Sequence, residues 1–298
     1  MPETEITENE LLGTPERVSE WRRFWRVFLQ RRIVIFGLVV FGVLVIVAIF
    51  ANFLAPHDPY LGNLPDSLLQ PNKTYWLGTD IQGRDTLSRL IFGTRTALEV
   101  GFITVSVGAV VGLTLGMMAG YFGGVLSAII LRVMDAMMSF PMLILALLLA
   151  AVLGGGIQNV IVALSIASVP GNARVMNGLV LSIKENDYIM SERSMGSSSL
   201  RIMLNHVLPN ALPPIIVLIT LQLGGIIMAE AGLSFLGIGI KPPGAAWGAM
   251  VNDGYKYLLT NPMLSFAPGI AIMLVVFAFN MIGDGLRDAL DPRLRGVI

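Results

Sequence analysis

Few residues in this 298-residue sequence have the types and spacing that chemistry requires. It has no cysteine and only two histidines, His57 and His206, which excludes thiolate metal sites, iron–sulfur clusters and cysteine nucleophiles. It also has no Gly-x-x-x-x-Gly-Lys-Ser/Thr phosphate loop and no His-Glu-x-x-His pair, the motifs of nucleotide hydrolysis and zinc-dependent proteolysis. We therefore expect neither a metal site nor ATP hydrolysis in this chain. Each histidine falls at the end of an apolar run, which favours an interfacial role.

Charged residues inside apolar runs are costly and therefore worth inspecting. Arg132 and Asp135 are spaced i, i+3 on one predicted helix, so we interpret them as a structural ion pair, with a substrate site as the alternative. Glu99 and Glu230 fall at the ends of predicted spans. A transporter coupled to protons or sodium usually needs a carboxylate near the middle of a span, and this sequence offers none there.

The composition places these residues in a membrane protein. The chain is 54% hydrophobic and 13% charged, about half the roughly 25% charged residues of a soluble domain. Its mean hydropathy is +0.73, so a soluble enzyme is excluded. The formal net charge is zero, which argues against nucleic acid as a partner because phosphate binding needs a basic surface.

Runs free of charged residues predict six membrane-spanning helices, since about 20 apolar residues cross a bilayer. Splitting the two longest runs at Gly120–Gly124 and Gly154–Gly156 gives spans at 33–54, 100–119, 125–153, 157–174, 211–229 and 264–283. The third span is longer than required and contains Pro141, so we expect tilt, a kink or a cytoplasmic extension. The expected fold class is an all-α integral membrane protein.

Basic residues are distributed unevenly around these spans. Thirteen lysines and arginines fall in the N-terminal segment, the C-terminal segment and the loop 175–210 with its edge, against six on the opposite side. Because cytoplasmic loops carry an excess of basic residues, both termini and this loop are predicted to be cytoplasmic.

Two N-terminal segments precede the first span. Residues 1–16 contain five glutamates, and we expect an acidic disordered tail. Residues 17–32 place aromatic side chains at helical spacing between arginines, which predicts an amphipathic helix on the inner leaflet. An ordinary helix packed on its own protein is the alternative.

Two predicted extracytoplasmic loops are long. In the loop 55–94 a proline-rich half precedes a stretch, 77–92, whose apolar residues share one helical face, so we expect a short amphipathic helix docked on the outer surface. In the loop 230–262 we expect Trp247 at the membrane interface and a short helix toward Tyr257.

The loop 175–210 is too long for a turn and too short for a catalytic domain. A helical stretch from about Lys184 to Met195 ends at Gly196, a natural C-terminal cap. A serine turn, a second short helix and Pro209 follow. We name residues 184–209 the elbow, and interpret it as a rigid element that transmits force from a partner protein, with a mere connector as the alternative.

The elbow carries a recognisable spacing. From Gly196 through His206 to Leu208-Pro209 it resembles the cytoplasmic loop motif of ATP-binding-cassette importer permeases, Glu-Ala-Ala-x3-Gly-x9-Ile-x-Leu-Pro. The front departs from the motif, because Met190-Ser191-Glu192 stands at the Glu-Ala-Ala positions and His206 at the isoleucine position.

The resemblance extends over residues 20–295 to the second permease of the dipeptide, oligopeptide and nickel importer family. The matching stretches are Leu77–Asp80, Gly83–Asp85, Leu87–Leu90, Ala119–Gly124, Arg132–Asp135, Phe140-Pro141, Leu233–Gly239, Pro242-Pro243, Trp247-Gly248, Gly283–Asp288 and Leu290–Pro292.

This resemblance implies a type I importer (MetI-like) permease fold in the bacterial cytoplasmic (inner) membrane, with a permease domain at 95–288 and a cytoplasmic C-terminus at 289–298. The chain would form half of a pathway for dipeptides, oligopeptides, glutathione or a nickel chelate. Its partners would be a homologous second permease, two cytosolic ATPases, which bind the ATP and Mg²⁺, and an extracytoplasmic binding protein. A stand-alone secondary transporter and a structural scaffold are the competing hypotheses.

The resemblance also implies roles for residues. Contacts to the ATPase would come from the elbow, with Glu192 or Arg193 replacing the motif glutamate missing at Met190; the residues are Tyr188, Glu192, Arg193, Gly196, Leu200, Arg201, His206, Leu208 and Pro209. An outer gate or a contact to the binding protein would involve Asp80, Arg84, Asp85, Glu230 and Trp247.

Overall fold

The computed structural model describes residues 20–290, and within them the regular structure is helical apart from one isolated bridge between Thr79 and Asp85. The predicted acidic tail 1–16, the start of the predicted interfacial helix and most of 289–298 lie outside the described residues. The helices are α2 (Glu20–Gln30), α3 (Arg32–Ile49), α4 (Ala51–Leu54), η1 (Leu64–Asp66), α5 (Thr86–Phe122), α6 (Gly124–Met138), α7 (Met142–Leu153), α8 (Ile157–Ile183), α9 (Asp187–Ser194), α10 (Ser199–Ile202), η2 (Met203–Val207), α11 (Leu208–Phe235), α12 (Trp247–Tyr255) and α13 (Met263–Leu290).

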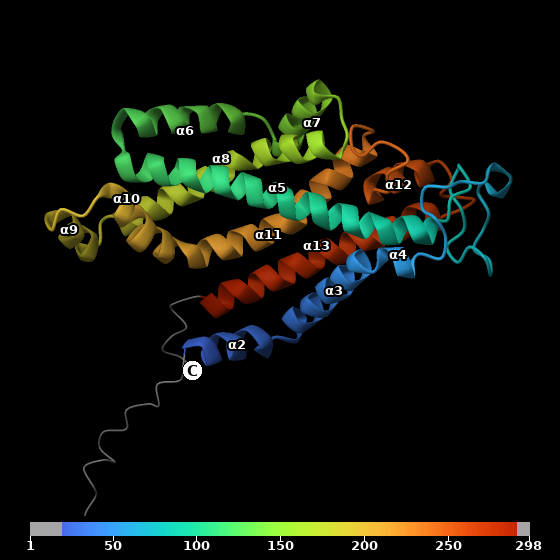
Figure 1. Ribbon diagram of the computed structural model, residues 1–298, viewed down its shortest axis with the longest axis horizontal. Coiled ribbons are helices and arrows are strands. Elements are labelled where there is room, and N and C mark those ends of the chain that lie inside the picture. Colours follow the sequence, from blue (N-terminus) through green and yellow to red (C-terminus); the bar gives the residue numbers. More distant parts are fainter. Residues whose placement is uncertain (1–19, 291–298) are drawn as a thin grey trace, which may run out of the picture.

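The long helices run lengthwise in an elongated bundle (Figure 1). The elbow, with α9 and α10, lies at one end, and α12 lies with the loop before α5 at the other. In the described part of the chain, five helices are long and apolar enough to cross a membrane, and the bent pair α6 and α7 makes a sixth if it counts as one span. The all-α, multi-span fold class is therefore confirmed.

The predicted third span, 125–153, is broken into α6 and α7. The two helices meet at 89° around Ser139–Pro141. Pro141 has no backbone N–H, and it disfavours helical geometry at the residue before it. The sequence predicted a kink here, and the structure shows a right-angled turn.

Two helices extend beyond the predicted spans. The stretch 77–92, expected to hold a separate amphipathic helix, is only partly helical. Residues 77–85 form a loop, and the rest is the first part of α5, which begins at Thr86 inside the predicted loop 55–94. Asp85 caps this start, because its carboxylate accepts a hydrogen bond from the Ser88 N–H at 2.9 Å. At the other end of the bundle α8 continues to Ile183, with Pro170 in its interior.

The closest packing in the bundle joins α5 and α8 through glycines. A Cβ added at Gly108, Gly112, Gly116 or Gly120, each four residues apart, would lie within 2.8 Å of an atom of α8. Residues four apart share a helix face, and small residues there let two backbones approach closely in a membrane.

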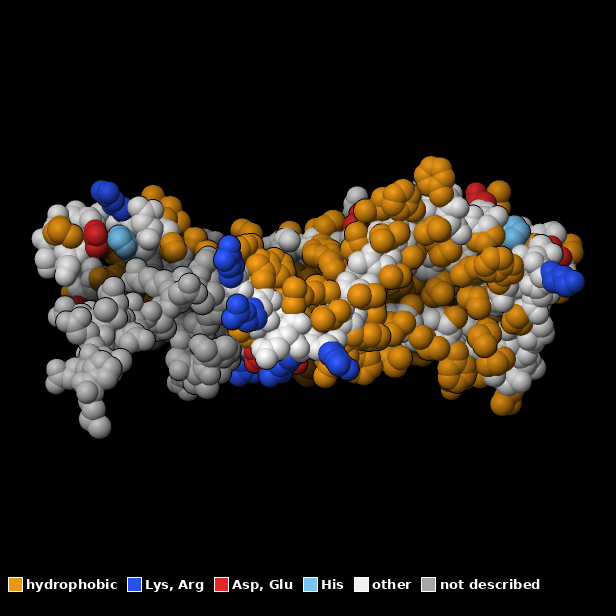
Figure 2. Space-filling model, turned by 90° about the horizontal axis from the view of Figure 1, so that it is seen from below, with side chains coloured by type: hydrophobic (Ala, Val, Ile, Leu, Met, Phe, Trp, Pro, Cys, Tyr) orange, Lys and Arg blue, Asp and Glu red, His pale blue; other side chains and the backbone are white. Residues whose placement is uncertain are grey.

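Exposed apolar side chains form a belt on the face of the bundle that Figure 2 shows. Figure 2 shows hydrophobic side chains over most of one face, with lysine and arginine side chains gathered at one edge of the belt. Helix α3 contributes exposed Ile33, Phe36, Val39, Val43 and Ile46, as expected for side chains that face lipid.

Helix α2 combines the two arrangements that its sequence left open. Its Phe28 is buried against Val34 of α3 and Ile282 of α13, so one side packs on the protein. Trp21 and Trp25 stay exposed, so its aromatic side also remains free to enter the leaflet.

Candidate functional site

The elbow projects beyond the other helices at one end of the bundle (Figure 1). Its first helix, α9, ends at Gly196, whose φ is +82°. The Gly196 N–H donates to the Arg193 carbonyl at 3.0 Å and the Ser197 N–H to the Glu192 carbonyl at 3.1 Å. These bonds satisfy carbonyls that the end of the helix leaves unpaired, and the predicted glycine cap is confirmed.

Glu192 and His206, separately predicted as ATPase contacts, are brought together in the structure. The Glu192 Oε1 atom lies 3.5 Å from His206 Nε2, and the Ser197 hydroxyl donates to Oε2 of the same carboxylate. This cluster ties α9 to η2 across the turn at Gly196, so both side chains help to shape the elbow.

The inner side of the elbow is anchored in the bundle. Ile189, Ile202 and Val207 are buried against Met176 and Val180 of α8. The side chain of Lys184 donates to the Gly120 carbonyl at 3.0 Å. These contacts attach the elbow to α5, α8 and α11.

The outer side of the elbow presents apolar side chains among polar ones. Met195 is 72% exposed and Leu200 63% exposed, and Tyr188, Met190 and Leu204 are exposed as well. Exposed serines and Arg201 lie between them, so the surface suits a protein partner better than lipid. The Arg193 guanidinium lies 5.2 Å from the ring centre of Tyr121 on α5.

The elbow continues into α11 without a break in the helical path. Leu208 and Pro209 form the first turn of α11, directly after the π-helical turn η2. Pro209 has no N–H to donate to the carbonyl four residues earlier. Leu208 is half-buried and Pro209 exposed, so the motif prolyl turn lies at the surface where the elbow meets the span.

The prediction that Arg132 pairs with Asp135 is wrong, because Asp135 has another partner. Asp135 of α6 pairs with Arg174 of α8, and Arg132 is exposed. Because α6 packs against α8, a guanidinium from the neighbouring helix takes the place of the one a turn away on the same helix.

The opposite end of the bundle carries residues 55–85 and 236–262, which we name the lobe. Asp80 is its centre, with Oδ2 2.6 Å from Arg84 Nε and 3.4 Å from Arg89 Nε. The Asp80 Oδ1 atom accepts hydrogen bonds from the backbone N–H groups of Gln82 and Arg84. Such a satisfied buried carboxylate fixes the loop before α5.

Arg89, on the first part of α5, is a residue whose role the sequence did not reveal. It is buried, and its guanidinium donates to the carbonyls of Pro59 at 3.1 Å and of Pro243 and Gly244 at 3.3 Å. It therefore joins both halves of the lobe to α5. The signal that could have pointed to Arg89 is its position in Leu87–Leu90, one of the stretches that resemble the importer permease family.

Trp247 does not lie at the membrane interface as predicted. It is 2% exposed, and its indole N–H donates to the Leu90 carbonyl at 2.9 Å. It packs over Gly93, where a Cβ would lie 2.5 Å from the indole ring. The indole is buried because the missing side chain at Gly93 leaves room for it.

The residues predicted for an outer gate or a binding-protein contact are all buried. Glu230 is 2% exposed and accepts a hydrogen bond from the Ser234 hydroxyl at 2.6 Å. Asp80, Arg84, Asp85 and Trp247 are buried as well. Asp80, Arg84, Asp85 and Trp247 therefore suit a structural role in the lobe, and Glu230 suits one near the end of α11.

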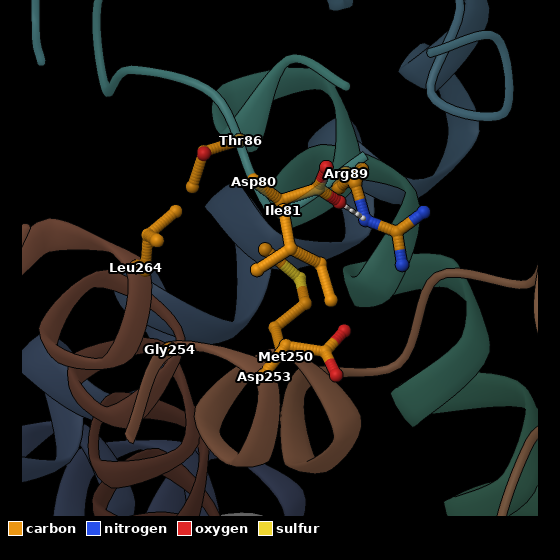
Figure 3. Close-up of a pocket in the computed structure, with 8 residues that line it drawn as sticks. All are labelled: Asp80, Ile81, Thr86, Arg89, Met250, Asp253, Gly254 and Leu264. Carbon is orange, nitrogen blue, oxygen red and sulfur yellow. Dashed lines mark ion pairs between the residues drawn. The ribbon is translucent and has the colours of Figure 1, made fainter. Parts of the chain in front are cut away.

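A cavity of about 10 Å³, about the size of one water molecule, lies inside the lobe between Asp80, Arg89 and Asp253 (Figure 3). The Asp80–Arg89 ion pair closes one side. Burial raises the pKa of Asp253, and the nearby Arg84 and Arg89 oppose that shift. Among the described residues no group of three or more histidine, aspartate and glutamate side chains is arranged to hold a metal.

A larger cavity, of about 450 Å³, opens where the bend between α6 and α7 faces α8 and α11. Its wall includes Met138, Pro141, Pro170 and Gln222. Sequence reasoning did not find this cavity, because it forms only when three separate segments pack together.

The bundle of spans, the elbow and the large cavity define a class: a membrane-spanning transport subunit. Residues 112–296 match the family described as binding-protein-dependent transport system inner membrane component, and residues 19–71 match the N-terminal TM domain of oligopeptide transport permease C. The chain belongs to the binding-protein-dependent permease family and is a multi-pass inner-membrane protein.

Individual relatives agree with this assignment. The chain is 40% identical over 287 residues to the glutathione transport system permease protein GsiD of Escherichia coli O1:K1, covering 96% of this chain and 95% of that protein. It is 41% identical over 284 residues to GsiD of Salmonella paratyphi A, covering 95% and 94%.

Solved structures share the fold. The inward-facing MetNI methionine ABC transporter gives a TM-score of 0.57 at 22% identity, covering 68% of this chain and 96% of that one. An amino acid ABC transporter solved with histidines gives 0.52 at 16% identity, covering 67% and 94%. The MetI-like permease fold is thereby confirmed.

Proposed function

We propose that this chain is the non-catalytic permease of an ATP-driven importer for short peptides, with glutathione-like tripeptides as the first substrates to test. It works with a second permease, two cytosolic ATPases that bind the ATP and Mg²⁺, and an extracytoplasmic binding protein. The similarity to GsiD and to oligopeptide permease C supports the substrate class. Dipeptides and a nickel chelate are the other substrates that the family resemblance implies.

The observation that carries the proposal is the construction of the elbow. Its inner side is packed on α8 and α11, its turn is fixed by Gly196, and its outer side exposes apolar side chains such as Met195 and Leu200. An ATPase seated on this surface would move two spans when it closes around ATP, and the pathway would change its open side. In this proposal the elbow end and both termini lie in the cytosol.

The large cavity weakens the competing hypothesis of a stand-alone secondary transporter. Among residues 20–290, no aspartate, glutamate, lysine, arginine or histidine lines it. Coupling to protons or sodium usually depends on an ionisable side chain inside the membrane.

Co-purification tests the proposal. The tagged chain, expressed with its neighbouring genes and extracted in mild detergent, should bring an ATPase with it, and the isolated chain should bind no nucleotide. A matched variant, Leu200→Glu with Met195→Glu, should insert normally but lose the ATPase. Nucleotide binding by the isolated chain, or an undiminished ATPase in the double variant, would contradict the proposed division of labour.

A further inference from the structure

The large cavity lies at the middle of the bundle. Pro170 is near the centre of α8 and Gln222 near the centre of α11, and both line the cavity. The α6–α7 bend supplies the facing wall with Met137, Met138 and Met142. A substrate that crosses the membrane must pass this depth.

Gln222 is the one long polar side chain on the wall, and it is held in place from behind. Its Nε2 atom donates to Asn172 Oδ1 at 2.9 Å, and Asn172 is fully buried and donates in turn to the Ser168 carbonyl at 3.3 Å. The Gln222 Oε1 atom is buried and has no hydrogen-bond partner among the described residues. Turning the amide round would still leave one of its two polar atoms unpaired.

An unpaired buried amide atom is costly unless something pairs with it. The Gln222 Oε1 atom is buried and does not itself face the cavity, but Gln222 lines the cavity with other atoms. The Nε2 group of its amide also has a second N–H that the bond to Asn172 does not use. A Cβ added at Gly171 or at Gly225 would meet no atom within 4 Å, although both glycines line the cavity.

The remaining wall suits varied side chains. Methionine is flexible and polarizable, and it lines surfaces that accept many partners. With no charged group on the wall, the cavity has no means to select a peptide by the charge of its side chains. The amide of Gln222 can pair with the peptide bond, which every peptide shares.

We propose that Gln222, positioned by Asn172, is the contact residue that hydrogen-bonds the backbone of a peptide in transit, while Met137, Met138 and Met142 adapt to its side chains. This inference rests on the proposed function. It adds the residue that contacts the substrate and the group that this residue recognises, the peptide bond. A partner side chain or a lipid acyl chain filling the cavity is the contrary outcome.

Uptake of trialanine and of glutathione into proteoliposomes that hold the complete complex tests this inference. Gln222→Leu keeps the bulk of the side chain and removes its amide. Thr220→Val is the matched control, because Thr220 lies on the same helix, does not line the cavity and bonds only within α11.

We expect Gln222→Leu to lower uptake of both peptides about tenfold, the factor that one hydrogen bond of about 1.4 kcal/mol corresponds to. Thr220→Val should transport like the unmodified complex. Loaded binding protein should still stimulate ATP hydrolysis in both variants, because neither touches the elbow. Equal uptake by the two variants overturns the inference.

If Gln222→Leu also loses the stimulation of ATP hydrolysis, the uptake result no longer isolates the cavity, and a labelling measurement then tests the inference. In this cysteine-free chain, Gly225→Cys places a thiol in the open space of the cavity. Loaded binding protein with ATP should slow its reaction with a small methanethiosulfonate, and an unchanged rate overturns the inference. Failure of the proposed function shows separately, because the unmodified complex would then transport neither peptide.

Discussion

One methyl group at Gly116 should destabilise the bundle, although alanine favours a helix over glycine. An added Cβ there would lie 2.2 Å from the Ala173 carbonyl oxygen and 2.8 Å from Met176 Cβ, both on α8. The nearer atom belongs to a helix backbone that cannot rotate away. The two helices would have to separate along their glycine seam.

The magnitude follows from two opposing effects. Replacing glycine by alanine inside a helix stabilises it by about 1 kcal/mol. Overpacking costs about 1–3 kcal/mol, and contact with backbone favours the upper end of that range. For Gly116→Ala we expect a net loss of about 1–2 kcal/mol in the free energy of unfolding.

Gly178→Ala on α8 is the matched control, because a Cβ there meets nothing within 4 Å. It should gain about 1 kcal/mol from helix propensity alone. The two variants should therefore differ by roughly 4–12 °C in Tm, at about 2–4 °C per kcal/mol. Thermal unfolding of the detergent-solubilised protein, followed by circular dichroism, measures this difference. Equal Tm values for the two alanine variants would refute the close α5–α8 seam.

Three further predictions concern the elbow, the topology and the lobe. Gly196→Val forces a β-branched residue to φ +82° at a cost of about 1–2 kcal/mol, so uptake should collapse while membrane insertion persists. Gly196→Asn should retain most of the uptake. Normal uptake by the valine variant would mean that the elbow is a mere connector. Asn63→Cys should react with an impermeant maleimide outside spheroplasts and Ser198→Cys should not, and reaction of the latter would invert the topology. Burial raises the pKa of Asp253 in the folded state, so the folded protein favours the protonated carboxyl. The folding stability that this preference gives is present at low pH and is lost as the pH rises through the folded-state pKa. Asp253→Asn should raise Tm relative to the unmodified protein at neutral pH and not near pH 3, and an equal effect at both pH values would contradict this sign.

Local patterns determined much of this molecule in advance. Apolar runs of about 20 residues can satisfy their backbone only as helices in a membrane, so the spans and the fold class followed from composition and length. The helix–glycine–helix order of the elbow followed from turn chemistry, because a glycine after a helical stretch offers the left-handed conformation that Gly196 adopts at φ +82°. These features depend on neighbours within a few residues.

Tertiary packing decided what neighbours in sequence cannot. Asp135 had a plausible partner three residues away, yet Arg174 on the adjacent helix pairs with it. Trp247 looked like a side chain for the membrane interface, but the missing Cβ of Gly93 admits its indole to the interior. The hydrogen bonds of Arg89 reach residues 30 and 155 positions away.

The large cavity belongs to the same group. Its wall needs the 89° turn at Pro141, the middle of α8 and the middle of α11 together. A proline predicts that a helix is interrupted and leaves the direction of the next helix open. Hydrophobic periodicity likewise shows which residues are apolar, but it does not show which faces meet. The sequence therefore determined the spans and the shape of the elbow, and packing between distant segments alone decided the ion pairs, the buried lobe and the cavity.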